Sequence, residues 1–294
     1  MRDYMAAMTD SKMKGFVRRL PWIGEKLAAK MGLPRVAVLR LSGVIGRTGV
    51  IRKGGLTLED LADPIERAFK TPHLSAVALA VNSPGGSPVQ SAQIARRIRA
   101  LSEENDVPVI AFCEDVAASG GYWLACAGDE IYVDGASIIG SIGVVSAGFG
   151  FPELLEKIGV ERRVHTSGDK KAILDPFRPE DPDEIAHLKE LQADIHEQFK
   201  EYVRSRRGER LNADEAVVFS GEFWTGHRAK ELGLVDEIGD LRSVMREKFG
   251  EKVRLQVVGE RKGWLQKRFN LQIAWADELL DAVEMRALWG RYGL

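Results

Sequence analysis

The sequence predicts an α/β protein built around a mainly parallel sheet. Between residues 36 and 133, apolar runs of strand length alternate with longer segments of helical period, and glycine-rich turns follow several of the apolar runs. Strands that alternate with helices form βαβ units, whose strands run parallel. Ligands bind beyond the carboxyl ends of such strands, so the glycine-rich turns are the first candidates for a functional site.

Each expected element follows from its own pattern. Strands are expected at 36–41, 75–82, 108–113, 130–133 and 253–258. Helices are expected near 57–69, 88–104, 183–207, 213–218 and 226–232, and a turn is expected at Gly239. The longest helix follows the acidic run PEDPD, which suits the positive end of a helix.

One catalytic domain, 35–258, is expected between two amphipathic ends. The N-terminal extension, 1–34, carries seven Lys and Arg residues against three Asp and Glu. One helical face of this extension consists of Met13, Phe16, Val17 and Leu20. Such a face is typical of a helix on a membrane surface, or of one that packs on its own domain or on a neighbouring subunit. The C-terminal tail, 259–294, is also amphipathic.

Composition excludes several classes of protein. The 42 Lys and Arg residues nearly cancel the 43 Asp and Glu residues among 294, so no nucleic-acid partner is expected. Cys113 and Cys126 lie in apolar stretches outside any CxxC pair, which predicts reduced thiols in the core and a reducing compartment. Neither a secretory signal nor a membrane-spanning helix is expected. The uncharged stretch 135–152 is rich in glycine and serine, which predicts a buried loop and strand. The expected location is the cytoplasm, or the inner face of the membrane as a peripheral protein.

Three glycine-rich segments carry the candidate chemistry: NSPGGS (82–87), ASGGYW (118–123) and GSIGV (140–144). In the second, Ser119 stands between a strand and a helix among small residues, which exposes its hydroxyl and leaves the following amides free. This arrangement suits a nucleophilic serine whose neighbouring N–H groups hold an oxyanion. The first segment can supply another oxyanion donor, because glycine lets a backbone approach a substrate closely. Similar turns also serve packing or phosphate binding, but neither GxxxxGK[ST] nor GxGxxG occurs.

A nucleophilic serine needs a base, and the sequence offers two kinds. None of the five histidines lies between His73 and His165, where the glycine-rich segments are, and no zinc-binding spacing is present. Each histidine is therefore interpreted as a surface or structural residue. Lysine is the other base that serves serine, and it must be neutral to do so. Lys170 and Lys171 stand before the apolar pair Ile173 and Leu174, so one of them can turn inward, although paired loop lysines are usually solvated.

Five ordered motifs resemble a known family. They are NSPGG, VAASGGYWLACAGDEIYV, GSIGV, SGDKKAILDPF and FSGEFWTGHRAKELGLVDEIGDL. Together they resemble the signal peptide peptidase (protease IV) family of Ser–Lys serine peptidases, over residues 35 to 245. The resemblance implies a ClpP/crotonase-like fold of stacked βαβ units, with extra terminal helices in this chain.

The resemblance also implies roles for particular residues. Ser119 matches the nucleophile, Lys171 the general base and Ser141 the serine that orients the lysine, whereas Lys170 does not align. The implied oxyanion hole consists of the amides of Gly120 and of Gly85 or Gly86. No metal or cofactor is implied.

The family also suggests partners. The substrates would be peptides or unfolded proteins, such as signal peptide remnants. The short relatives form homo-oligomeric rings in which neighbouring subunits complete each site. Membrane-bound relatives carry a transmembrane helix, where this chain has the basic extension 1–34.

Two other functions compete with a Ser–Lys peptidase. The first is another enzyme of the ClpP/crotonase-like fold. A Clp-type protease with a Ser–His–Asp triad would have a histidine about 25 residues after the serine, and a crotonase relative that acts on acyl-CoA, such as a hydratase, would have glutamates near its glycine-rich loops. The segment GSIGVVSAG contains no histidine, and no suitable acid follows NSPGG. A non-catalytic scaffold or regulator is disfavoured by the intact Ser119, Ser141 and Lys171.

Overall fold

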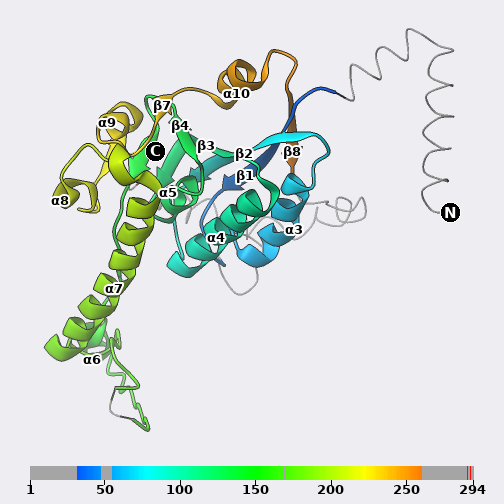
Figure 1. Cartoon of the computed structure of the whole chain (residues 1–294). Helices are drawn as coiled ribbons and strands as arrows, with labels where there is room; N and C mark the ends of the chain where they lie inside the picture. The colour runs from blue at the N-terminus through cyan, green and yellow to red at the C-terminus, as the bar shows by residue number, and fades with distance from the viewer. Residues whose placement is uncertain (1–31, 48–54, 169, 260–289, 291, 293–294) are drawn as a thin grey trace, which may run out of the picture.

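The structure, a computed structural model, describes residues 32–47, 55–168 and 170–259 together with 290 and 292. Within these residues eight strands form one sheet (Figure 1). The strands are β1 (Arg35–Ser42), β2 (Leu74–Ser83), β3 (Val109–Ala118), β4 (Glu130–Val133), β5 (Ile138–Gly140), β6 (Phe223–Thr225), β7 (Glu237–Ile238) and β8 (Arg254–Val258). The α-helices are α3 (Leu58–Phe69), α4 (Pro88–Asn105), α5 (Gly120–Ala125), α6 (Pro152–Lys157), α7 (Pro182–Arg207), α8 (Glu215–Val218), α9 (Gly226–Glu231) and α10 (Leu241–Phe249).

The sheet is parallel apart from one pairing. Its main path runs β6-β5-β3-β2-β1-β8, with β4 paired to β3 and β7 paired to β4. Only β5 and β6 are antiparallel among the described pairings. The predicted α/β class with a mainly parallel sheet is confirmed. Because β2 and β3 run in the same direction, the loops after them meet at one edge of the sheet.

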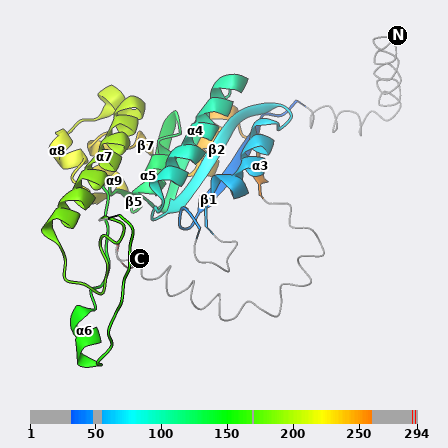
Figure 2. The same ribbon diagram turned by 90° about the horizontal axis from the view of Figure 1, so that it is seen from below.

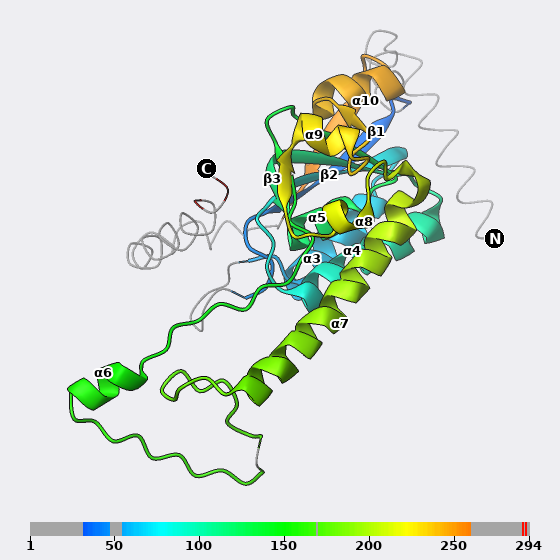
Figure 3. The same ribbon diagram turned by 90° about the vertical axis from the view of Figure 1, so that its left-hand side faces the viewer.

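The two faces of the sheet bury different sets of side chains. Alternate residues of a strand point to opposite faces. Leu39 and Leu79 belong to the large apolar cluster that includes α3 and α4, whereas Val38 and Ala78 pack with Met245 of α10. Figure 3 shows α10 on the other side of the sheet from α3 and α4. The central strands β1, β2 and β3 are therefore largely buried on both faces, which explains their almost continuous apolar sequences.

One segment projects from this body. Residues 146–181, here called the arm, include α6 and run from the loop after β5 to the start of α7. Figures 2 and 3 show the arm extending away from the sheet, with α7 leading back to it. None of the helices in the described residues is long and apolar enough to cross a lipid bilayer.

The predicted elements agree with the structure where their patterns were long. The predicted strand 130–133 and the helix 183–207 correspond to β4 and α7. The strand β3 continues to Ala118, five residues past the predicted end, because the charged pair Glu114 and Asp115 interrupts the apolar pattern but not the backbone pairing. The elements β6 and β7 were not predicted, since two or three residues are too few to show a period, whereas β5 lies in the stretch 135–152, where a strand was expected. The helix α10 was also missed.

Other predictions have mixed outcomes. Both cysteines are free and buried, as expected. The stretch 135–152 begins as the buried strand β5, but the prediction that all of it is buried is wrong, because the side chain of Phe149 is 82% exposed. The predicted N-terminal helical face and most of the C-terminal tail lie outside the described residues.

Candidate active site

Ser119 occupies a sharp turn between β3 and α5. Its backbone has φ +53° and ψ −123°, a conformation with positive φ that residues other than glycine rarely adopt. The Ser119 N–H donates to the carbonyl of Gly140 (2.8 Å), and its own carbonyl accepts from Trp123 (3.0 Å). Buried residues surround this turn on the strand and on the helix. In other proteins, a strained strand-to-helix turn of this kind exposes the Oγ atom of a nucleophilic serine at the end of a sheet.

The loop after β2 comes against the same turn. A Cβ atom on Gly85 would lie 2.8 Å from the Cβ of Ser119 and 2.9 Å from the nitrogen of Gly120, so only glycine fits there. A Cβ on Gly86 would lie 2.1 Å from the carbonyl oxygen of Ile45. The two glycines also have φ values of +104° and +144°. Both positions in NSPGG therefore require glycine for close backbone packing, Gly85 against the Ser119 turn and Gly86 against Ile45.

The amides of these two glycines differ in their hydrogen bonds. The Gly85 N–H donates to the hydroxyl of Ser83 (3.2 Å). The Gly86 N–H makes no hydrogen bond with the residues that the structure describes. Sequence alone left open which of the two is an oxyanion donor, and of the two amides only that of Gly86 is without a partner among the described residues.

Ser119 and Ser141 line one pocket, with a volume of about 520 Å³. Ser141 also has a positive φ (+53°), and its N–H donates to the carbonyl of Glu222 (2.6 Å), just before β6. The other lining residues are Val44, Pro84, Gly85, Gly86, Pro88, Gly143, Val144, Val145, His196, Ser220, Gly221 and Tyr292. The structure therefore brings together four of the six predicted site residues, and Gly120 adjoins them directly after Ser119.

His196 is a pocket residue that sequence reasoning did not single out. It lies on α7, and its Nε2 atom is 3.0 Å from the carbonyl oxygen of Ile142, the residue after Ser141. Burial and the nearby Lys200 lower the pKa of His196, which favours the neutral imidazole. No signal in the sequence marks this position, because nothing in a helical pattern links residue 196 to residue 142.

Lys171 does not line this pocket. It is exposed and lies on the arm, where its backbone N–H donates to the carbonyl of Gly168 (3.1 Å). The arm is held together by its own contacts, since Arg162 lies 3.0 Å from the buried carboxylate of Asp175 and 4.7 Å from the ring centre of Phe177. Within the single chain, the predicted base and the predicted nucleophile are on different parts of the molecule.

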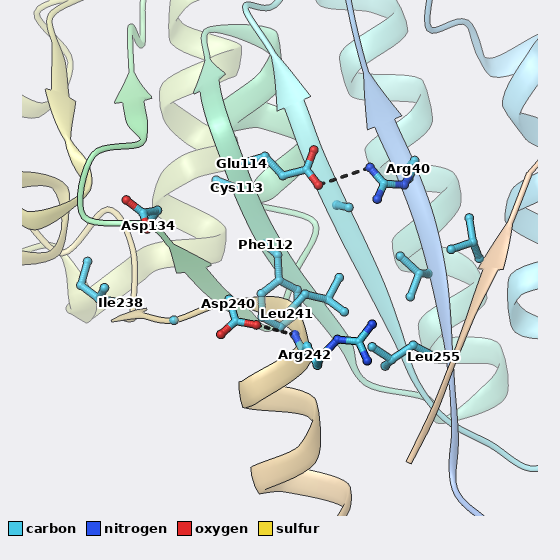
Figure 4. Close-up of a pocket in the computed structure, with 14 residues that line it drawn as sticks. Arg40, Phe112, Cys113, Glu114, Asp134, Ile238, Asp240, Leu241, Arg242 and Leu255 are labelled. Carbon is cyan, nitrogen blue, oxygen red and sulfur yellow. Dashed lines mark hydrogen bonds and ion pairs between the residues drawn. The ribbon is translucent and has the colours of Figure 1, made fainter. Parts of the chain in front are cut away.

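A second cavity, of about 610 Å³, lies on the sheet face that α10 covers. Figure 4 shows Arg40 and Glu114 at its rim, paired at 3.3 Å, and Phe112 and Leu255 along its wall. Cys113 also lines this cavity, and burial raises the pKa of its thiol. Among the described residues that line it there is no serine or lysine. The larger cavity therefore lacks the groups that acyl transfer by a Ser–Lys pair needs.

Residues 102–253 match the family model described as peptidase family S49. The chain belongs to peptidase family S49. The matched residues include Ser119, Ser141 and Lys171. S49 membership and the relatives that are named as proteases confirm the resemblance inferred from the motifs.

Relatives of this S49 peptidase include longer proteins. It is 49% identical to a Na⁺/H⁺ antiporter NhaA of Brucella abortus over 88% of its own length, but it spans only 37% of that relative. It is 32% identical to the chloroplastic serine protease SPPA of Arabidopsis thaliana, over 71% of its own length and 31% of the plant protein. Among solved structures, a mutant of the 1510-N membrane-bound stomatin-specific protease in complex with a substrate peptide is similar at 14% identity. That likeness covers 85% of this chain and 98% of the other, with a TM-score of 0.47.

Proposed function

We propose that this S49 peptidase is an endopeptidase with a Ser–Lys dyad, in which Ser119 is the nucleophile and Lys171 of a neighbouring copy is the general base. The observation that carries the proposal is the Ser119 turn, which shares one pocket with Ser141 and the two glycines. Lys171 is exposed on the projecting arm, so a second copy can present it to the pocket. Because a second copy supplies Lys171, the active form would be a homo-oligomer, like the rings of the short signal peptide peptidases that the motifs resemble.

The proposed reaction transfers an acyl group twice. The neutral Lys171 amine takes the proton of the Ser119 hydroxyl as Oγ attacks the peptide carbonyl, and the amides of Gly120 and Gly86 hold the oxyanion. The C–N bond breaks, and the lysine gives its proton to the leaving amine. A water molecule, deprotonated by the same lysine, then attacks the ester, and Ser119 recovers its proton. The hydroxyl of Ser141 orients the lysine amine.

The pocket suits apolar, unfolded substrates. Val44, Val144 and Val145 line it together with two prolines, and its described lining includes no Asp, Glu, Lys or Arg. An apolar segment of a peptide gains free energy by leaving water for such a wall. Remnants of signal peptides have this composition, and contact with a membrane surface through the N-terminal extension would bring the enzyme to them.

Replacing the nucleophile tests the proposal. Ser119→Ala should lower the hydrolysis of unfolded casein or of an apolar fluorogenic peptide by more than about 10⁴-fold. Ser205→Ala is the matched control, because Ser205 lies on α7 and its hydroxyl donates only to the carbonyl of Tyr202 among the described residues. Full activity in Ser119→Ala would overturn the assignment of the nucleophile.

A further inference from the structure

The helix α7 contacts both of the backbone segments that carry the pocket serines. Its residues Phe199 and Tyr202 stack on Trp123, four residues after Ser119, with ring centres 4.5 and 5.5 Å apart. Three residues before Phe199, His196 reaches the carbonyl of Ile142, next to Ser141. Residues three apart share one face of a helix. One face of α7 therefore supports the Ser119 turn and the Ser141 loop together.

The contact with His196 is the last side-chain hydrogen bond to the Ser141 loop before the arm, among the residues that the structure describes, and the side chain of Ile142 itself is buried in the core. Gly140 is fixed by the Ser119 N–H, and Ser141 by the carbonyl of Glu222. After Ile142, the next backbone hydrogen bond in the described chain is the one from Phe151 to Pro176, already within the arm. Within the described residues, the buried side chain of Ile142 and the contact of its carbonyl with His196 therefore hold the Ser141 loop against motion of the arm.

The chemistry of the contact says which form of His196 makes it. A carbonyl oxygen only accepts hydrogen bonds, so the contact is a hydrogen bond when Nε2 carries the proton. Its neutral form has one N–H, and burial favours that form while Lys200 and Glu197 on the same helix act in opposite directions. In the neutral form with the proton on Nε2, the basic lone pair is on Nδ1 and not on the nitrogen that faces Ile142.

We propose that His196 is a positioning residue of this peptidase. Its Nε2–H holds the carbonyl of Ile142 and thereby positions the Ser141 hydroxyl, which orients the amine of the lysine base. This proposal rests on the proposed function, since Ser141 matters to the reaction only if a lysine is the base. The side chain is not a catalytic residue, because it acts through Ile142 and not on the reacting atoms.

Two substitutions separate positioning from base chemistry. His196→Gln keeps an N–H donor near the place of Nε2 but has no basic nitrogen, and His196→Leu keeps the bulk but has no donor. We expect His196→Leu to lower kcat by about ten-fold or more with little change in KM, because Ser141 is displaced, and His196→Gln to stay within about three-fold of the wild type. The matched control is His187→Leu, nine residues earlier on the same helix, where the ring is exposed.

The outcomes are distinguishable. Unchanged kcat in His196→Leu would overturn the proposal, and so would an equal loss in His196→Gln, which would show that the imidazole acts as a base. Thermal midpoints and oligomeric state are measured for each variant. If His196→Leu does not fold, His196→Asn replaces it, because the shorter amide cannot reach Ile142. Ser119→Ala is assayed alongside: if it stays active, the proposed function fails and the positioning role fails with it, whereas an inactive Ser119→Ala with an active His196→Leu refutes the positioning role alone.

Discussion

The pocket and the arm are built in opposite ways. Ser119 and Ser141 sit on backbone turns that are fixed by hydrogen bonds to Gly140 and Glu222 and are surrounded by buried residues. The arm leaves large apolar side chains in solvent, with Leu154 51% and Ile158 60% exposed as well as Phe149. One chain therefore positions the proposed nucleophile and the proposed oxyanion amides, while the proposed base, Lys171, lies on a surface that has nothing to pack against within the described part of the chain.

This difference has a physical consequence for the site. Exposed apolar residues that lie close together are typical of an interaction surface, because they gain free energy when another protein covers them. A second copy of the chain would cover the arm and receive Lys171 at its own pocket in the same step. The catalytic site is then completed only when the chains assemble, so a peptidase assay reports on assembly and an assembly assay reports on the site.

The largest expected effect comes from mixing two inactive variants. Ser119→Ala has only the lysine and Lys171→Ala has only the serine, so each alone should be inactive. If neighbouring copies share a site, an equal mixture assembled from subunits should recover about a quarter of the wild-type activity, because about one interface in four joins an intact serine to an intact lysine. Lys170→Ala is the control and should remain active by itself.

The mixture can also contradict the shared site. If Lys171→Ala alone is inactive and the mixture stays inactive after the subunits are shown to exchange, the dyad forms within one chain and the arm must fold back. Full activity of Lys171→Ala would remove that lysine from the mechanism altogether.

A smaller effect is expected from charge on the arm surface. Leu154→Asp and Ile158→Asp place a carboxylate on side chains that are exposed in the single chain. The fold of one chain should tolerate them, while burial of an unpaired charge at an interface should weaken assembly and lower activity by about ten-fold or more. Size-exclusion chromatography with light scattering and a peptidase assay measure the two together. Val257→Asp is the control, since Val257 is 59% exposed on β8, away from the arm.

Equal losses in Val257→Asp and in the arm variants would show a general cost of surface charge instead of a specific interface. Normal assembly in Leu154→Asp and Ile158→Asp would show that the arm is not the contact surface.

The sequence predicted the local backbone geometry at Ser119 better than it predicted which distant residues join the pocket. A glycine-flanked serine after a strand is enough to predict the Ser119 turn, because the backbone requirement is local and only small residues meet it. Lys171 is different, since its role depends on how copies of the chain meet, which no local pattern encodes. His196 was missed for a related reason: its partner, Ile142, is 54 residues away and offers a carbonyl, which any residue type can supply.

The smallest effect on activity is expected at the Arg207–Asp236 pair, which lies outside the pocket. A substitution there should lower the free energy of unfolding and leave kcat unchanged. The side chain of Arg207 is 1% exposed and donates to Asp236 at 2.8 Å. Burial alone would raise the pKa of Asp236, but the hydrogen bond and the charge of Arg207 outweigh it, so the pKa lies below its usual value. A carboxyl with a lowered pKa in the folded state stabilises the protein above the unfolded-state value of about 4 and loses that contribution as pH falls through the folded-state pKa.

Asp236→Asn should therefore lower the free energy of unfolding by about 3 kcal/mol at pH 7, because it leaves the buried Arg207 guanidinium without its counter-charge. The deficit relative to the wild type should shrink as the pH falls from about 4 through the lowered folded-state pKa of Asp236, because the folded wild-type carboxylate is then protonated too. Urea unfolding at several pH values measures it, and kcat should stay unchanged, since the pair lies outside the pocket. Glu237→Gln is the control, an exposed neighbour paired with Lys230, and should cost measurably less. A fall in kcat at unchanged stability would instead mean that the Arg207–Asp236 pair helps to position Ser119. The residues that hold the pocket in place would then extend beyond the turns at Ser119 and Ser141.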